Sequence, residues 1–149
     1  MSYVGDLRKL IGHRPLILVG SVVIIINDSN QILLQRRVDR NKWGLPGGLM
    51  ELGESTEETA RREVLEETGL ALGDLHLVDV FSGKDNYVEL PNGDQFYVVA
   101  TCYYTKEYYG EMVVDLTESF EAHFIDIGDL PDRLVGSHRK MVERYCQRL

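Results

Sequence analysis

The chain has 149 residues, of which 44% are hydrophobic and 27% charged, a composition typical of a globular protein. This length predicts one domain over residues 1–149, with a core that needs no disulfide or structural metal. The net charge of −8 argues against stable nucleic-acid binding and against an anionic membrane surface, although bound cations can reverse the local sign for a phosphate compound.

The first predicted element is a strand over Leu16–Ile26, an apolar run rich in β-branched residues. Turn-forming residues at 27–30 lead into Gln31–Arg37, which is predicted to return as its hairpin partner. Trp43–Gly48 holds three glycines and a proline, so we expect a tight loop there.

The central predicted helix begins with a capping box at Ser55 and Glu58, runs to Thr68 and stops at Gly69. Residues 91–94 form a turn signal, and a glycine interrupts the chain before residues 111–114. The other predicted elements are strands over Leu75–Phe81, Phe96–Thr105 and Ala122–Ile127 and a helix over Ser137–Arg148. Together they predict an α/β (α+β) fold with a mixed, largely antiparallel sheet.

The sequence gives no sign of export or of a membrane segment. Its longest apolar run is about half of a membrane span, and no signal-peptide pattern precedes it. Cys102 and Cys146 are far apart and form no CxxC pair, which is typical of a reducing compartment. We therefore expect a cytoplasmic protein.

Three glutamates crowd one face of the central predicted helix. At about 100° per residue, Glu63 and Glu67 lie about 40° apart, and Glu66 falls about 60° to the other side of Glu63. Like charges at these spacings destabilise a helix by roughly 0.2–0.5 kcal/mol per pair. A hard divalent cation would offset that repulsion, because Mg²⁺ prefers carboxylate oxygens.

An isolated E-x-x-E-E pattern is more typical of a solvated acidic face. Here the acidic face lies beside the apolar residues Ala60 and Val64, so we expect it to turn partly inward. The glycine-rich loop before the helix permits a close backbone approach, through which the carbonyl of Gly48 could add a ligand. This context favours a metal site.

Residues 48–70 match the Nudix box, G-x5-E-x7-R-E-U-x-E-E-x-G-U with U aliphatic, at all nine specified positions. The chain therefore resembles the Nudix hydrolase family and its MutT-like members. The resemblance implies an α/β/α sandwich and Mg²⁺ or Mn²⁺ as cofactor. It also implies hydrolysis of the phosphoanhydride in a nucleoside diphosphate linked to another moiety: a nucleoside triphosphate, nucleotide sugar, ADP-ribose or dinucleoside polyphosphate.

Roles for the residues of the box follow from the same resemblance. Glu63 and Glu67 correspond to the principal metal ligands, and Gly48 corresponds to a carbonyl ligand. Arg62 would orient the glutamates through a charge-assisted hydrogen bond, and Glu54 would support the loop and the metal shell.

The base that activates water has more than one candidate. Glu66 resembles either a third metal ligand or this base, whereas some family members place the base on a later loop. On that loop Glu118 is the first candidate and Glu121 the second, judged by their distance before Phe124. We favour Glu118 and keep Glu66 as the alternative.

Two arginines end the strand that is expected to run beside the metal face. A guanidinium there could hold a terminal phosphate, and Arg37 aligns with the family's phosphate contact better than Arg36 does. An exposed, charged strand end is the alternative for both. Trp43 is predicted to fill the core rather than to stack on a base.

Three further residues are candidates for substrate contact. Tyr87 lies seventeen residues after the box, where diadenosine polyphosphate hydrolases of the family have a tyrosine. His138 and Arg139 lie near the start of the last predicted helix, where family members sometimes contact the base. Other side chains of the base pocket cannot be read from spacing.

Two other functions are compatible with the resemblance. A non-catalytic nucleotide-sensing module usually loses box carboxylates or carries a DNA-binding segment, and the sequence displays neither. An isomerase of allylic diphosphates needs a reactive cysteine near the site, but Cys102 is in a predicted strand and Cys146 is near the end of the chain. The sequence thus predicts a hydrolase with a nucleotide-type small-molecule substrate, and homodimers are common among similar proteins.

Overall fold

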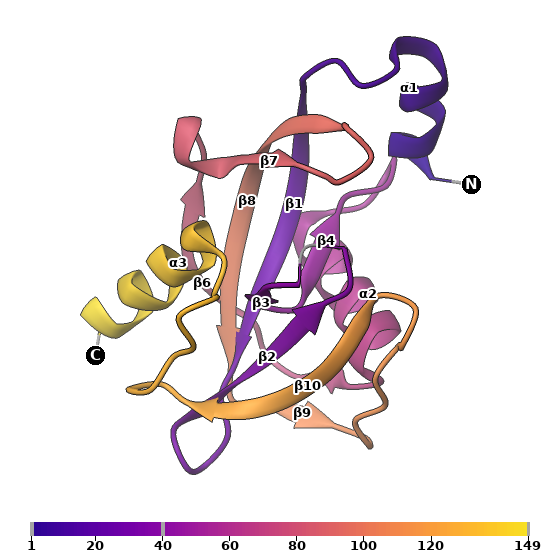
Figure 1. Ribbon diagram of the computed structural model, residues 1–149. Helices are drawn as coiled ribbons and strands as arrows, with labels where there is room; N and C mark the ends of the chain where they lie inside the picture. Colours follow the sequence, from indigo (N-terminus) through magenta and orange to yellow (C-terminus); the bar gives the residue numbers. More distant parts are fainter. Residues whose placement is uncertain (1, 40, 149) are drawn as a thin grey trace.

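The computed structural model describes residues 2–39 and 41–148. Strand β1 (Leu16–Ile25) lies inside the main sheet, parallel to β8 (Gln95–Thr105) and antiparallel to β4 (Gly47–Leu49). Strand β8 also pairs antiparallel with β6 (His76–Phe81) and β7 (Tyr87–Glu89) (Figure 1). The predicted mixed, largely antiparallel sheet is confirmed.

Two smaller sheets and three α-helices complete the described fold. The sheets join β10 to β2 and β3, and β5 to β9. These elements are β2 (Gln31–Arg37), β3 (Trp43–Gly44), β5 (Ala71–Leu72), β9 (Tyr108–Tyr109), β10 (Ser119–Asp126), α1 (Tyr3–Ile11), α2 (Thr56–Thr68), α3 (Gly136–Gln147) and the short 3-10 helix η1 (Lys84–Asn86).

Alternate side chains of β1 enter two separate hydrophobic clusters, because neighbouring strand residues point to opposite faces. Val22 and Ile24 join the cluster that includes Met141 of α3. Val23 and Ile25 join the cluster that includes Val64 of α2. The two helices therefore cover opposite faces of the sheet, which explains why the predicted strand is apolar throughout.

Helix α2 has the limits that its sequence predicts. The Ser55 side chain accepts from the Glu58 N–H, and the Glu58 side chain accepts from the Ser55 N–H in return. Gly69 ends the helix in the left-handed conformation, with φ 77° and ψ 0°. The helix that carries the Nudix box is thus fixed at both ends by local chemistry.

The predicted hairpin between the first two strands is wrong. The chain does turn after β1, but the only bridge between the two segments in the described chain joins Ile26 to Ile32. Both edges of β1 are occupied, by β4 and β8, so β2 pairs with β10 and β3 instead. This rearrangement carries the end of β2 to the glutamate face of α2.

Other elements differ from the predicted ones in smaller ways. The predicted loop 43–48 contains the short strands β3 and β4 on either side of Leu45 and Pro46. Helix α1 and strand β7 were not predicted. Neither has a fully buried residue, so neither has a strong burial pattern in its sequence. In the described residues, no helix is long and apolar enough to cross a membrane.

Candidate active site

Arg62 is the centre of the hydrogen-bond network on α2. Its Nε and Nη2 donate to the two carboxylate oxygens of Glu54 at 2.6 and 2.9 Å. Its Nη1 donates to Glu63 Oε1 at 2.8 Å, and its Nη2 also donates to the carbonyl of Leu49 at 3.0 Å. One guanidinium therefore joins the helix, the loop before it and β4.

Glu54 is held as a charged group. Besides the paired bonds from Arg62, it accepts from the Glu51 N–H at 2.8 Å and from the Thr59 hydroxyl at 3.1 Å. The hydrogen bond from Arg62 is the largest cause that lowers the pKa of Glu54 to about 2. Glu54 thus stabilises the loop in its ionised form.

Glu67 is the most buried carboxylate of the acidic face, with a side chain that is 2% exposed. It accepts from Arg37 Nη1 at 3.0 Å and from the Gly47 N–H at 2.9 Å. Burial nevertheless raises the pKa of Glu67 to about 7, which means that these two donors do not fully compensate its charge. A cation beside this carboxylate would supply the missing compensation.

Glu63 lies directly against Gly48. A Cβ atom at position 48 would fall 2.3 Å from Glu63 Cδ, so any larger residue would force the Glu63 side chain out of its present position. Burial is also the largest cause that raises the pKa of Glu63. The close approach gives a physical reason for the glycine that begins the box.

Glu66 differs from its neighbours, since its side chain is 59% exposed and lies 3.4 Å from Arg62 Nη1. Within residues 2–39 and 41–148, no three side chains of metal-binding type converge as they stand. Glu63 and Glu67 instead contact Arg62 and Arg37. Their buried, incompletely compensated carboxylates still form an all-oxygen donor set, which fits a hard divalent cation.

The loop before β10 brings Glu118 toward the acidic face. The Val113 and Asp115 N–H groups donate to the last-turn carbonyls of α2, at 2.7 and 3.4 Å. The carbonyl of Glu118 accepts from the Val38 N–H at 2.8 Å. Burial is the largest cause of the raised pKa values of Glu63 and Glu67, and the negative charge of Glu118 is a smaller cause of both.

Glu121 and Arg36 pair with each other instead of facing this site. Arg36 Nη2 lies 2.8 Å from Glu121 Oε2, and the guanidinium stacks 4.5 Å from the ring centre of Phe120. Glu121 also bonds to His123 at 2.9 Å. Of the candidate residues on β2 and the loop, Arg37 and Glu118 are the two that approach the acidic face.

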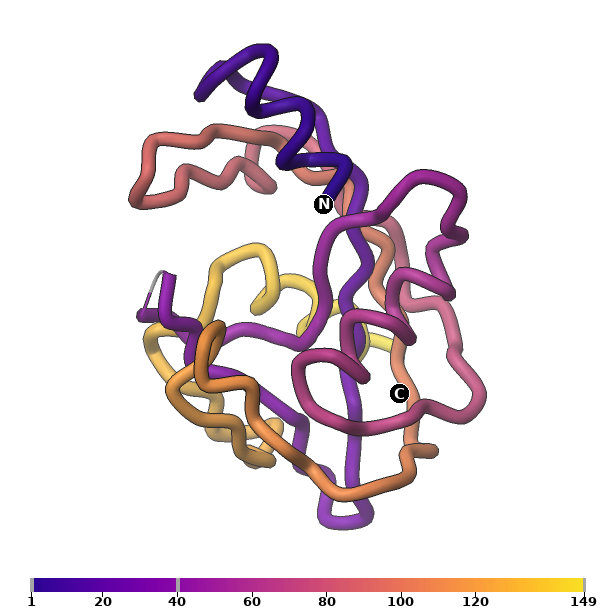
Figure 2. Tube along the Cα trace, turned by 90° about the vertical axis from the view of Figure 1, so that its right-hand side faces the viewer, coloured from indigo at the N-terminus to yellow at the C-terminus, as the bar shows by residue number. Residues whose placement is uncertain are grey.

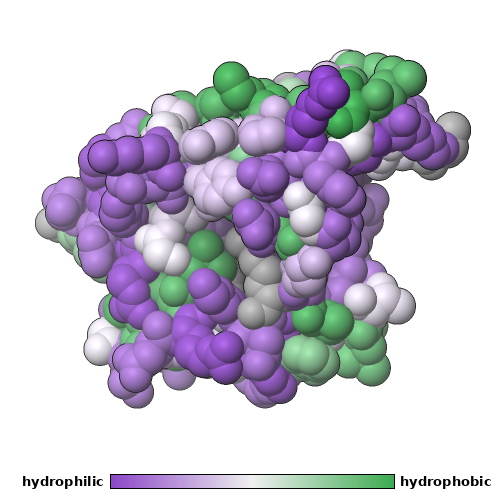
Figure 3. All heavy atoms as spheres, turned by 45° about the horizontal axis from the view of Figure 1, so that its top comes forward, coloured by the Kyte–Doolittle hydropathy of each residue, from purple (hydrophilic) through white to green (hydrophobic). Residues whose placement is uncertain are grey.

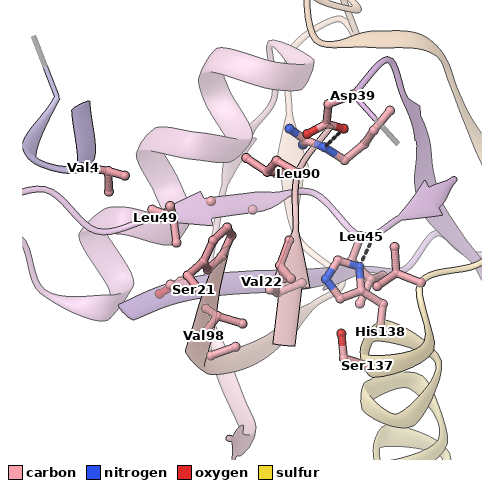
Figure 4. Close-up of a pocket in the computed structure, with 18 of the residues that line it drawn as sticks. Val4, Ser21, Val22, Asp39, Leu45, Leu49, Leu90, Val98, Ser137 and His138 are labelled. Atoms are coloured by element: carbon pink, nitrogen blue, oxygen red, sulfur yellow. Dashed lines mark hydrogen bonds and ion pairs between the residues drawn. The ribbon is translucent and has the colours of Figure 1, made fainter. Parts of the chain in front are cut away.

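A cavity of about 240 Å³ lies on the side of β4 that faces away from α2. Figure 4 shows Val22 and Val98 in its centre, Leu45 and His138 beside α3, and Val4 of α1 at the opposite end. Its apolar lining consists mainly of Val22, Leu45, Leu49, Phe96, Val98 and Met141. An apolar cavity with a few polar groups is the usual form of a small-molecule site.

Three residues belong to both the cavity and the acidic site. Arg37, Gly47 and Gly48 line the cavity. Arg37 and the Gly47 N–H bind Glu67, and Gly48 packs against Glu63. A ligand that extends from the cavity past these residues reaches the carboxylates of α2.

The other substrate candidates have different positions. His138 lines the cavity, and its Nδ1 accepts from the Leu45 N–H at 3.0 Å. Arg139 donates to the carbonyl of Pro131 at 2.7 Å and is not among the cavity-lining residues. Tyr87 lies on β7 with its hydroxyl 3.0 Å from Glu89, while its neighbour Val88 lines the cavity. Trp43 packs against the core cluster beside α3, as predicted.

Sequence reasoning missed most of the cavity. Its lining comes from α1, β1, β2, β4, β7, β8, α3 and the loops between them, so no local spacing in the sequence connects these residues. Val4 and Arg8 lie in a helix that was not predicted. Phe96 and Val98 follow the predicted strand alternation, but which of the two strand faces borders a cavity depends on the helix packing.

Comparison with known proteins identifies the family and supports the fold. The NUDIX domain family matches residues 17–145, so the chain belongs to that family. The predicted class, a Nudix hydrolase acting on phosphorus acid anhydrides, is confirmed at this level.

Two relatives and one solved structure illustrate the likeness. A Bacillus subtilis (strain 168) protein, provisionally named 8-oxo-dGTP diphosphatase, is 32% identical over 85% of this chain and 78% of its own length. A Methanocaldococcus jannaschii protein named ADP-ribose pyrophosphatase is 34% identical over 83% of this chain and 70% of its own. The crystal structure of a MutT NUDIX hydrolase from Burkholderia pseudomallei matches with a TM-score of 0.74 at 28% identity, over 87% of this chain and 98% of that one.

Proposed function

We propose that this chain is a divalent-metal-dependent pyrophosphohydrolase that cleaves the phosphoanhydride of a nucleoside diphosphate linked to another moiety. The observation that carries the proposal is the junction of the two sites: Arg37, Gly47 and Gly48 line the apolar cavity and also contact the carboxylates of α2. A compound with a flat aromatic base at one end and a diphosphate at the other matches this arrangement.

The acidic face would hold Mg²⁺ or Mn²⁺ through Glu63 and Glu67, with Glu66 and the Gly48 carbonyl as further ligands. A bound ion would neutralise the diphosphate and lower the pKa of a coordinated water. Arg62 and Arg37 keep Glu63 and Glu67 oriented through the hydrogen bonds described above.

Glu118 is the favoured base, because it approaches the acidic face from a loop and has no assigned metal-ligand role. It would take a proton from the attacking water. The water oxygen bonds to phosphorus, the phosphoanhydride P–O bond breaks, and its electron pair leaves with the departing phosphate oxygen. Glu66 remains the alternative base.

The size of the cavity supports one nucleoside as its occupant. At about 240 Å³ it lies below the range of roughly 300–1,000 Å³ that is usual for drug-sized ligands. His138 and Phe96 are the residues with which a base would have polar and stacking contact. A nucleotide-type substrate, a cytoplasmic location and a homodimer stay predictions.

The decisive test is turnover of a nucleotide panel that includes oxidised deoxynucleoside triphosphates, ADP-ribose, nucleotide sugars and dinucleoside polyphosphates. Products are identified by mass. Phosphate-chain cleavage by the wild-type protein and its loss in Glu67→Gln are the expected results, with Glu57→Gln as a matched control because Glu57 is exposed on the same helix. Tight nucleotide binding without any turnover would instead identify a sensing module.

The isomerase alternative has no support at the site. Cys102 is fully buried in the core cluster beside α3, and burial raises the pKa of its thiol to about 12. A thiol in that environment is not nucleophilic at neutral pH. Cys146 is exposed on α3 and does not line the cavity.

A further inference from the structure

Helix α1 precedes the part of the chain that matches the family, yet Val4 and Arg8 line the cavity. Figures 1 and 2 both show α1 beside the turn between β7 and β8, at the end of the main sheet away from α3. Hydrophobic residues are visible on the surface at this end of the molecule (Figure 3), where Leu10 is 82% exposed. Since α1 has no buried residue, a few specific contacts must hold it in place.

Arg8 provides most of those contacts, with a side chain that is 11% exposed. Its Nη1 donates to the carbonyls of Gly12 and Arg14, at 3.0 and 2.6 Å. Its Nη2 donates to the carbonyl of Gln95 at 2.7 Å, at the start of β8. One guanidinium therefore fastens the end of α1 to the main sheet.

Arg8 also lines the cavity, but its guanidinium is turned toward the protein. Arg8 Nε is buried, has no hydrogen-bond partner among the described residues and lies 3.6 Å from Asp94 Oδ1, its ion-pair partner. Arg8 therefore holds α1 in place, and Val4 is the other α1 residue that lines the cavity.

The other end of α1 contacts the support of the acidic site. The Tyr3 N–H donates to Glu51 Oε1 at 2.9 Å, and the Glu51 N–H donates to Glu54 Oε1 at 2.8 Å. Glu54 in turn holds Arg62. Helix α1 thus spans the distance from the loop of the Nudix box to the far wall of the cavity.

We propose that α1 is a substrate-specificity element of this protein, an inference that rests on the proposed function. Val4 contacts the face or edge of the bound nucleobase. Arg8 is a positioning residue that holds α1, and with it Val4, at the wall of the cavity. The residues of α2 that would act on the diphosphate are separate, so α1 selects the base and leaves the reaction to the Nudix box.

Calorimetric titration in Mg²⁺ buffer tests this without turnover, because the probes are the four ribonucleoside 5′-monophosphates and ribose 5-phosphate. Arg8→Gln is expected to weaken binding of the tightest-binding monophosphate about tenfold. Binding of ribose 5-phosphate should be unchanged, since that probe has no base. Val4→Trp should weaken binding of the same nucleotide, because the larger side chain fills part of the cavity while the Arg8 contacts remain. Arg14→Gln is the matched control, because the Arg14 side chain does not line the cavity.

The outcomes separate this inference from the proposed function. If the wild-type protein binds none of the monophosphates, the nucleoside cavity itself is wrong. If it binds them and both variants bind equally well, only the role of α1 is overturned. If ribose 5-phosphate binding is weakened as much as nucleotide binding, the role of α1 is also overturned, because α1 would then support the fold rather than contact a base. In steady-state assays on the substrate that the panel identifies, Arg8→Gln should raise KM far more than it lowers kcat.

Discussion

The acidic site and the cavity are built in opposite ways. Nearly all of the acidic site comes from one stretch, between Gly48 and Glu67, where helical spacing and a capping box fix the geometry. The cavity takes residues from Val4 to Met141, and packing alone brings them together. Charged groups that hydrogen-bond to each other hold the first, whereas the second is mainly apolar.

This difference indicates how substitutions in the acidic site and in the cavity will act. Moving one carboxylate of α2 changes several hydrogen bonds at once, because Arg62 joins three segments of the chain. Changing one wall residue of the cavity alters its shape and leaves the carboxylates in place. We therefore expect changes in the acidic site to affect kcat and changes in the cavity to affect KM.

Removal of divalent metal should have the largest effect on the acidic site. We expect exhaustive chelation to abolish turnover and Mg²⁺ or Mn²⁺ to restore it, because clustered carboxylates cannot bind a polyanion without cations. Phosphate release is measured in chelator and during back-titration with metal. Nucleoside monophosphate binding in the cavity should weaken much less, and turnover that persists in chelator would contradict the metal site.

Glu67→Gln should lower kcat by about 10²–10³-fold while the fold stays intact, a loss typical of removing one electrostatic element of a site. Glu67 binds both Arg37 and the Gly47 N–H, so this variant changes the junction between the two regions. Steady-state kinetics and circular dichroism check it beside Glu57→Gln. Near-normal turnover in Glu67→Gln would rule out the metal-ligand assignment.

The two candidates for the residue that activates water, Glu118 and Glu66, lie on different elements, so single variants can distinguish them. Glu118→Gln should lower kcat by about 10²-fold with metal affinity nearly unchanged, because Glu118 is on a loop. Glu66→Gln should weaken metal binding as well as turnover, because Glu66 is on the metal helix. Metal titrations and kcat for both single variants decide between them. A Glu118→Gln enzyme with normal kcat would assign the role to Glu66.

The smallest predicted effect concerns stability. The folded-state pKa of Glu54 is about 2, below its ordinary 4.5, so its ionised form stabilises the fold above pH 4.5, and this contribution is lost as pH falls toward 2. The full shift corresponds to roughly 3.4 kcal/mol, and solvent screening of this partly exposed pair reduces it, so Glu54→Gln should lower the free energy of unfolding by about 2 kcal/mol at pH 7. Denaturant unfolding of both proteins in chelator measures it. A difference that stays constant down to pH 2 would point to packing instead of charge.

Local sequence determined the acidic site and most of the elements around it. Strand alternation, the capping box at Ser55 and the stop at Gly69 act over a few residues, so the spacing of the box already predicts which side chains share a helix face. The main sheet was predicted as mixed for the same reason: its longer strands have clear apolar patterns.

Tertiary structure alone decided strand pairing and the cavity. The sequence around residues 27–30 favours a hairpin, but β4 and β8 occupy both edges of β1, and β2 joins another sheet. That pairing carries Arg37 to Glu67, while Arg36 pairs with Glu121 on the neighbouring strand. Helix α1 is held by the Arg8 contact with Gln95, eighty-seven residues away. Contacts between residues so far apart in the chain depend on how all the elements pack, and no local pattern encodes them.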